Sequence, residues 1–308
     1  MKEKICVAGI GAIGGLVAAM LGSKYGGSLS LIARGERAKA LREKGVVLHS
    51  DFYGEHRASP AQVAASGEEL GVQDYVFVCV KNYSLDQIIP QIAPCIGRET
   101  VVVPIMNGVE AGDRLRAAFP DALACDGLIY TITGANPDFS VTQKGSYTHL
   151  FLGSKVREEN RVAGARRAWE LLKGSGLDAR WSEDIESEIW QKFILNCAFN
   201  TVTARYLADS ARLRADEGLR QDLWDLLNEA YQVGLAQGVS LPKDLVETKF
   251  HFMMEKQPPD ATSSMRRDVE AGRPTEYDAF TGAILRKAKV FHIPVPVTER
   301  YHRELAQL

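Results

Sequence analysis

The sequence predicts an α/β protein with a doubly wound N-terminal domain over residues 1–181 and a mostly α-helical domain over residues 182–308. The first half alternates short apolar runs with helical patterns, and each run is continuously apolar, as in parallel strands buried on both faces. From about Ser182 onward the pattern is helical and is broken only by glycines and prolines. The length of 308 residues is also that of about two domains.

The predicted strands of the first half follow one another with helices between or after them. The strands are expected at residues 4–8, 29–33, 74–80 and 101–105. The helices are expected from the glycine turn after the first strand to about residue 25, and near 35–43, 84–93 and 111–118. Such alternation is typical of a doubly wound sheet. Residues 122–153 are rich in Thr, Tyr and Val with glycine turns, which predicts further strands, antiparallel ones, before a helix near 158–173 and a short strand near 178–181.

The second half opens with a helix that Ser182 is expected to cap, because the first turn after it is acidic, as a helix dipole favours. Farther on, Ser263 or Ser264 is expected to begin a short helix that ends at Gly272. Pro274 and Thr275 are expected to begin another helix, with Glu276 in its first turn. Taken alone, that acidic position is explained by capping electrostatics.

Composition and charge exclude several classes of protein. Hydrophobic residues make up 45% and charged residues 25% of the chain, the balance of a globular domain and not of a disordered one. The 37 basic and 39 acidic residues give a net charge of −2, so we expect no nucleic-acid partner and no attraction to an anionic membrane. The five cysteines form no C-x-x-C pair, which favours a reducing cytoplasm without disulfides. The six histidines show no zinc-binding spacing, so no metal site is expected.

Residues 5–23 carry no charge and follow Lys2 and Lys4, a pattern shared by signal peptides and membrane spans. Five glycines within this stretch make a poor membrane helix. Their spacing is better explained by a ligand-binding turn, so we expect neither export nor membrane insertion.

The glycines form the motif G-I-G-A-I-G at residues 9–14, directly after the first strand and at the start of a helix. In this context the motif indicates a Rossmann-type dinucleotide site. Gly9 permits the tight turn, Gly11 lets the backbone approach a pyrophosphate, and Gly14 lets helix and strand pack closely. Ala12 and Ile13 complete the predicted cofactor loop. A glycine turn without a ligand is the alternative.

The end of the second strand favours NADPH. NAD-binding domains usually place an acidic residue there for the ribose 2′-hydroxyl, whereas this chain has Arg34, which suits a 2′-phosphate. Arg37 is placed to assist. Lys81, at the end of the third strand, faces the same edge of the sheet and adds positive charge. The alternative is that Arg34 is a solvated loop residue and Glu36 binds the ribose.

The second domain begins with W-Q-K-F-I-L-N-C-A-F-N at residues 190–200. Lys192, Asn196 and Asn200 are spaced by four residues, so they lie within about 80° on one helix face. The helix is otherwise apolar and therefore predicted to be buried, so this polar stripe is expected to line a binding site. A solvated helix face is the alternative.

Together these segments resemble the ketopantoate reductases, or 2-dehydropantoate 2-reductases. The resemblance runs through nearly the whole chain, in order. It includes G-I-G-A-I-G at 9–14, V-K at 80–81, N-G at 107–108, K-F-I-L-N-C-A-F-N at 192–200, S-S-M-R-R-D at 263–268, G-R-P-T-E-Y-D at 272–278 and I-P-V-P at 293–296. The lysine–asparagine stripe followed by the two later motifs is far more specific than the glycine loop.

The resemblance implies NADPH-dependent reduction of 2-dehydropantoate to (R)-pantoate, in pantothenate and coenzyme A synthesis, at an active site in the interdomain cleft. Lys192 matches the family's catalytic lysine and Glu276 its partner carboxylate. Four further positions match residues that hold cofactor or substrate: Asn107, Asn196, Asn200 and Ser264. Asn107 is expected to serve both ligands.

Three positions depart from the pattern expected of the family. Phe280 and Thr281 replace an aliphatic residue and an asparagine before Gly282, and His292 stands where a glycine usually precedes I-P-V-P. These departures leave the substrate open, so reduction of another 2-keto acid or 2-keto amide is the alternative. Non-catalytic NADPH sensing is a more distant alternative, and the intact Lys192 and Glu276 argue against it because a sensor needs no proton donor. The sequence leaves the oligomeric state open, with a homodimer among the alternatives.

Overall fold

The computed structural model describes residues 3–308, which divide into two compact units. The first holds the chain up to Asn107 together with Ala111–Glu186, and the second holds Gly108–Glu110 with Ser187–Leu308. The division falls inside helix α6 (Ile185–Tyr206), five residues later than the expected boundary at 181/182. The first two residues of α6 stay with the first unit, where Ile185 packs closely against Gly153: an added Cβ on Gly153 would lie 2.7 Å from the Ile185 Cβ.

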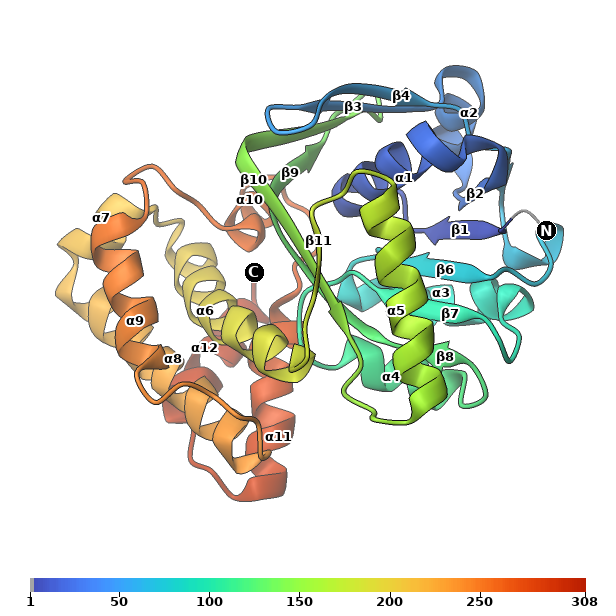
Figure 1. The fold of residues 1–308 in the computed structure, drawn as a ribbon. Coiled ribbons are helices and arrows are strands. Elements are labelled where there is room, and N and C mark those ends of the chain that lie inside the picture. Colours follow the sequence, from blue (N-terminus) through green and yellow to red (C-terminus); the bar gives the residue numbers. More distant parts are fainter. Residues whose placement is uncertain (1–2) are drawn as a thin grey trace. The chain divides into compact units, whose positions relative to one another are not determined.

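The first unit is built on a six-stranded parallel sheet in the order β5-β2-β1-β6-β7-β8 (Figure 1). Its strands are β1 (Ile5–Ala8), β2 (Leu29–Ile32), β5 (Gln62–Ala64), β6 (Tyr75–Val78), β7 (Val101–Pro104) and β8 (Leu123–Ala124). This is the strand order of the dinucleotide-binding fold: the first three strands add toward one edge of the sheet, and the fourth strand lies on the other side of the first. The predicted doubly wound sheet is confirmed.

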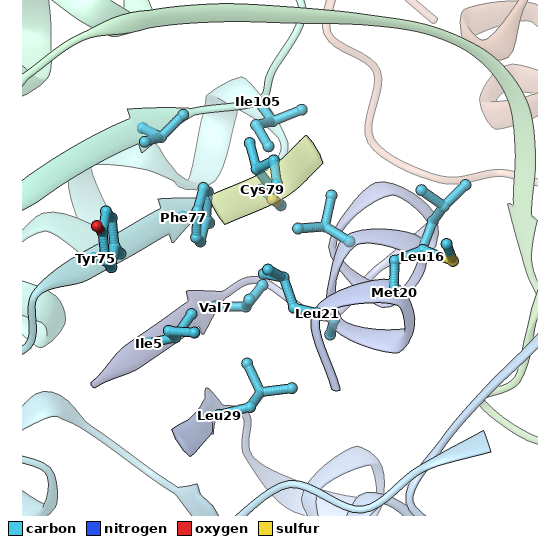
Figure 2. Close-up of a cluster of buried hydrophobic side chains, with 14 of the residues drawn as sticks. Ile5, Val7, Leu16, Met20, Leu21, Leu29, Tyr75, Phe77, Cys79 and Ile105 are labelled. Carbon is cyan, nitrogen blue, oxygen red and sulfur yellow. The ribbon is translucent and has the colours of Figure 1, made fainter. Parts of the chain in front are cut away.

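Helices cover both faces of this sheet, as the continuous burial of its strands requires. They are α1 (Ala12–Tyr25), α2 (Gly35–Lys44), α3 (Leu85–Ile92), α4 (Ala111–Ala118) and α5 (Glu159–Gly174). Ile5 and Val7 of β1 point into a core that also contains Leu16 and Leu21 of α1, with Leu21 beside Val7 (Figure 2). The alternate residues of β1 face a separate core formed with α3 and α4.

A second sheet of five strands lies in the same unit. Its strands are β3 (Val46–Ser50), β4 (Gly54–Ala58), β9 (Asp126–Ala135), β10 (Val141–Gly153) and β11 (Ala179–Trp181). The prediction of antiparallel strands over 122–153 is right for β9 and β10 and wrong for β8. The N–H of Leu123 donates to Thr100 O and that of Cys125 to Val102 O, so β8 extends the parallel sheet instead.

Short 3₁₀ turns connect several of these elements. They are η1 (Gly26–Ser28), η2 (Gly67–Glu69), η3 (Asn82–Ser84) and η4 (Ala93–Cys95). All five cysteines of the chain are buried free thiols.

The second unit is helical. Besides α6 it contains α7 (Ser210–Ala215), α8 (Glu217–Ala236), α9 (Leu245–His251), α10 (Ser264–Glu270), α11 (Ala283–Phe291) and α12 (Pro296–Leu305), with π-helical turns η5 (Phe252–Lys256) and η6 (Asp278–Gly282). The segment 108–110 belongs here because Val109 packs against the helical core and Glu110 pairs with Arg286 at 2.8 Å.

Two predicted helix starts are wrong. Ser182 does not cap α6, because its N–H donates to Leu152 O and continues the strand pairing, so the helix begins only at Ile185. Glu276 does not lie in a first helical turn, because the helical backbone begins only at Tyr277; the Glu276 carbonyl accepts from the N–H of Ala279, so Glu276 stands directly before the helix. The choice between Ser263 and Ser264 is settled: Ser263 is the N-cap of α10 and accepts from Arg266 N at 3.0 Å.

Candidate active site

The glycine-rich loop joins β1 to α1, and each of its three motif glycines has a different reason to be glycine. Gly9 has φ +92°, and an added Cβ would lie 2.5 Å from the Val80 Cγ1. A Cβ at Gly14 would lie 2.0 Å from Gly9 O. By contrast, a Cβ at Gly11 would meet no atom within 4 Å. Gly9 and Gly14 are therefore fixed by packing within the chain, whereas Gly11 leaves its backbone open to an approaching group.

The N-terminus of α1 is suited to an anion. Its N-cap, Gly11, supplies no side-chain hydrogen bond, and its first turn holds no acidic residue. The first N–H groups and the positive end of the helix dipole are therefore not neutralised by a side chain of this helix. Ala12 and Ile13 are the first two helical residues and are partly exposed. These features fit a dinucleotide pyrophosphate.

Arg34 and Arg37 lie on the helix that follows β2, in different environments. Arg34 is the exposed N-cap residue of α2, and Glu36 is exposed in its first turn. Arg37 is partly buried, donates from Nη1 to Ile10 O at 2.5 Å, and has its Cζ 4.8 Å from the ring centroid of Phe139. Arg34 is thus available to a ligand, whereas Arg37 is already bound to the glycine-rich loop.

Lys81 and Asn107 follow β6 and β7, whose carboxyl ends lie at the same sheet edge as the glycine-rich loop. Lys81 is the partly buried N-cap of η3. The next residue, Asn82, donates from Nδ2 to Asn107 O at 3.0 Å, which ties the two loops together. The first unit therefore gathers all its predicted cofactor residues at one edge of the sheet, where open α/β sheets bind ligands.

In the second unit, Lys192, Asn196 and Asn200 lie on α6 as expected. The first two are partly exposed, whereas Asn200 is only 4% exposed. The Asn200 side chain makes no hydrogen bond to another residue of the described chain, 3–308. An asparagine that is nearly buried and whose amide makes no hydrogen bond within the described chain has its donors and acceptor left for a ligand, so the predicted ligand-binding role of this stripe has a physical basis.

Lys192 and Glu276 interact electrostatically within this unit. Burial lowers the pKa of Lys192 to about 8, and the Glu276 carboxylate opposes that shift by favouring the ammonium form. Glu276 is 5% exposed. A lysine whose pKa lies near neutrality beside a buried carboxylate is typical of a functional site.

The start of α10 is fixed to α6 one turn beyond Asn200. Thr203 of α6 donates to Ser263 Oγ at 2.7 Å, and both residues are buried. Ser263 thus has a structural role. Ser264, the first residue of α10, is partly exposed, as a ligand-binding residue requires.

The three departures from the family pattern have visible structural roles. Phe280 stacks on Phe193, and Thr281 donates to Tyr277 O at 2.9 Å and contacts His302 Nδ1 at 2.9 Å. His292 ends α11 in the left-handed conformation, φ +55°. Two of these contacts, Phe193 with Phe280 and Thr281 with His302, join residues far apart in the chain, so the spacing of residue types does not predict them.

Two family models match this chain and together cover most of its length. The model of the family described as "Ketopantoate reductase PanE/ApbA" matches residues 5–155, and that of its C-terminal part matches residues 184–308. The chain belongs to the ketopantoate reductase family. The resemblance that the motifs predicted is thereby confirmed.

Individual members of the family are similar over their whole length. A 2-dehydropantoate 2-reductase of Mesorhizobium japonicum is 32% identical over 314 residues, covering 96% of this chain and 94% of the relative. The crystal structure of 2-dehydropantoate 2-reductase from Methylococcus capsulatus has a TM-score of 0.86 at 25% identity, covering 99% of this chain and 96% of the other. The chain is therefore similar to both relatives along nearly their whole length.

A D-mandelate dehydrogenase solved with NADH and anilino(oxo)acetate also has the ketopantoate reductase fold. Its TM-score is 0.85 at 21% identity, with coverage of 99% of this chain and 97% of that one. This likeness concerns the fold alone. One fold can serve different substrates, so the fold does not determine the substrate of this chain.

Among the helices of residues 3–308, none has the length and apolar character needed to span a membrane.

Proposed function

We propose that this ketopantoate reductase family member catalyses the NADPH-dependent reduction of 2-dehydropantoate to (R)-pantoate, a step of pantothenate and coenzyme A synthesis in the cytoplasm. The observation that carries the proposal is the pairing of Lys192, whose pKa burial lowers to about 8, with the buried Glu276. A reductase needs a proton donor that is charged at neutral pH yet able to release its proton, and this lysine meets both requirements.

The cofactor is assigned to the first unit. Gly9, Gly11, Ala12, Ile13 and Gly14 would cradle its pyrophosphate, because Gly11 leaves the backbone open and no side chain caps the N-terminus of α1. Arg34 would bind the 2′-phosphate, and Lys81 and Asn107 would contact the cofactor from the ends of β6 and β7. A bound nicotinamide supplies the hydride.

The substrate is assigned mainly to the second unit. Lys192 would donate a hydrogen bond to the ketone oxygen and then its proton to the nascent alkoxide. Asn196, Asn200 and Ser264 offer the donors and acceptors that a hydroxylated 2-keto acid needs, with Asn107 assisting. Glu276 would accept a hydrogen bond from a substrate hydroxyl. The proposed reaction needs both sets of residues.

Another 2-keto acid or 2-keto amide is the second candidate substrate. It is favoured by the D-mandelate dehydrogenase that shares this fold. A further neighbour is a dimeric ketopantoate reductase from Staphylococcus aureus, with a TM-score of 0.80 at 20% identity. We extend the proposal to a homodimer on the strength of that neighbour.

The decisive experiment measures consumption of NADPH by the purified protein with 2-dehydropantoate and with a panel of other 2-keto acids and amides. We expect kcat/KM for 2-dehydropantoate to exceed every other value by at least about tenfold, as loss of one or two buried hydrogen bonds would cost. A higher value for another keto acid would favour the second candidate. Binding of NADPH without turnover of any substrate would favour a sensing protein.

A further inference from the structure

Phe139 has an unfavourable backbone conformation in the turn between β9 and β10. Its φ is +70°, which large side chains rarely adopt because Cβ crowds the backbone. The turn is held by hydrogen bonds on both sides. Phe139 N donates to Asn136 O at 3.0 Å, Asn136 N donates to Ser140 O at 2.8 Å, and Ser140 Oγ donates to Asp138 Oδ1 at 2.7 Å. Strain that a structure maintains in this way often marks a functional position.

The side chain of Phe139 contacts the residue that holds the glycine-rich loop. Its ring centroid lies 4.8 Å from the Arg37 Cζ, close enough for a cation–π contact. Arg37 in turn donates to Ile10 O at 2.5 Å. Ile10 lies between the first two glycines of the motif, so the strained turn reaches the loop through a single arginine.

A second contact joins the same segment to the helix after the loop. Val141, two residues beyond Phe139, packs against α1 at Gly15, where an added Cβ would lie 2.5 Å from the Val141 Cγ2. The turn is therefore in contact with the loop region at two points. The burial that lowers the pKa of Arg37 agrees with a guanidinium enclosed between these elements.

The hydrogen bond to Ile10 O has a consequence for the next N–H group. The carbonyl of Ile10 and the N–H of Gly11 belong to one planar trans peptide, so they point in opposite directions. Fixing the carbonyl on Arg37 therefore also fixes the direction of the Gly11 N–H. Gly11 is the residue whose backbone is open to a ligand.

We propose that Phe139 and Arg37 are positioning residues that orient the Ile10–Gly11 peptide for the pyrophosphate of the dinucleotide. This inference rests on the proposed binding of a nicotinamide dinucleotide at the loop. It assigns different roles to the two arginines at the start of α2: Arg34 binds the 2′-phosphate, whereas Arg37 fixes the conformation of the glycine-rich loop. Because NADPH and NADH share the pyrophosphate, Arg37 and Phe139 act equally on both.

The test measures dissociation constants of NADPH and NADH by fluorescence for Phe139→Gly, Phe139→Tyr and Arg37→Met. Glycine adopts the required φ without strain but removes the ring, whereas tyrosine keeps the ring. We expect Phe139→Gly and Arg37→Met to weaken both cofactors by the same factor of about three to ten. Phe139→Tyr should bind as the unmodified protein does. The ratio of the two constants should stay unchanged in all three variants.

Leu207→Gly is the matched control, because Leu207 is also a large apolar residue with positive φ, +49°, and lies in the second unit. It should leave both dissociation constants unchanged. Combining Phe139→Gly with Arg37→Met should weaken binding no more than Arg37→Met alone, since both changes break one chain of contacts. Arg37→Met keeps the test decisive if Phe139→Gly does not fold.

Three results would overturn the inference: unchanged affinity in both Phe139→Gly and Arg37→Met, equal loss in Phe139→Gly and Phe139→Tyr, or loss for NADPH alone in Arg37→Met. The last result would assign Arg37 to the 2′-phosphate. Failure of the unmodified protein to bind either cofactor would instead contradict the proposed function.

Discussion

The ring of Phe280 stacks on the ring of Phe193, with centroids 6.1 Å apart and planes inclined by 14°. Phe193 directly follows Lys192 on α6, and Phe280 lies four residues after Glu276 in η6. Both rings are at most 2% exposed. This contact therefore fixes the segment that carries the glutamate against the helix that carries the lysine.

Replacing Phe280 by leucine should loosen the link between Lys192 and Glu276. A weaker interaction with the carboxylate lets burial lower the pKa of Lys192 further, so the alkaline decline of kcat/KM should move to lower pH. We expect kcat/KM to fall by about tenfold, as small displacements at a catalytic centre cause. Steady-state kinetics over a pH series measure both effects.

Phe250→Leu is the control for that variant, because it removes another aromatic contact of the same unit, the edge-to-face pair of the partly buried Trp224 and Phe250 at 5.1 Å. Both variants should lose stability, by about 1–2 kcal/mol. Only Phe280→Leu should shift the pH profile. An equal shift in both variants would show a general effect of destabilisation and contradict the positioning role.

Lys192 should determine the alkaline limb of the pH profile. Burial lowers its pKa from 10.5 to about 8, so the ammonium is the main form below that pH and is lost above it. We expect kcat/KM to fall as pH rises through about 8, as the free protein loses its proton donor. Lys192→Ala should reduce kcat by about 10²–10⁴-fold while the dissociation constant of NADPH changes little.

Glu276→Gln tests the assignment of Lys192 as the proton donor, because the direction of the expected pH shift is fixed. The Glu276 carboxylate raises the pKa of Lys192, so its neutral replacement should move the alkaline limb to lower pH. It should also raise KM and lower kcat together if Glu276 binds a substrate hydroxyl. Two results would contradict the assignment of Lys192 as the acid. One is an alkaline limb of the pH profile that does not move in Glu276→Gln. The other is a Lys192→Ala variant that keeps more than about a tenth of the unmodified kcat when hydride transfer is rate-limiting.

Asn200→Ala should raise KM for 2-dehydropantoate about tenfold, the effect of one or two buried hydrogen bonds. The fold should tolerate the change, because alanine favours helices and Asn200 makes no side-chain hydrogen bond to the described chain. The neighbouring Thr201→Val is the control, since it removes a hydroxyl that is buried without a partner among residues 3–308. Unchanged KM in Asn200→Ala would show that the polar stripe does not bind substrate.

Arg34→Asp should erase or reverse the preference for NADPH over NADH, which we expect to be at least tenfold in kcat/KM. Arg34 is exposed at the end of β2, and one or two charge-assisted hydrogen bonds of about 1.5–3 kcal/mol each account for that ratio. Lys39→Asp makes the same change of charge at another exposed position of α2 and should leave the ratio unaltered. Equal kcat/KM for both cofactors in the unmodified protein would contradict the assignment.

The parts of the fold that were predictable from sequence are those with strong local patterns. Strand β6 (Tyr75–Val78) is buried on both faces and therefore continuously apolar. Strand β4, with the sequence G-E-H-R-A, is a largely exposed edge strand without such a pattern, and β5 has only three residues. Neither these two strands nor β3 was predicted, because their stability comes from tertiary pairing rather than from hydrophobic periodicity.

The candidate site divides in the same way. The glycine loop and the stripe on α6 were visible because their spacing is short and regular. The bond from Arg37 to Ile10 joins residues 27 apart, and that from Thr203 to Ser263 joins residues 60 apart. The spacing of residue types carries no signal for such contacts. For the contacts of Phe280 and Thr281, the sequence contains one local indication: both residues depart from the pattern expected of the family.

His292→Gly should stabilise the protein. His292 ends α11 with φ +55° and ψ +37°, and the N–H of Ile293 donates to Ala288 O at 3.0 Å, as in a helix end that favours glycine. Its exposed side chain contributes little packing. Relief of the left-handed strain should outweigh the added flexibility of the unfolded chain and raise the free energy of unfolding by about 0.5–1 kcal/mol. Urea unfolding measures this change. His292→Ala keeps a Cβ in the left-handed conformation and should bring no gain, so equal stability of the two variants would contradict this explanation.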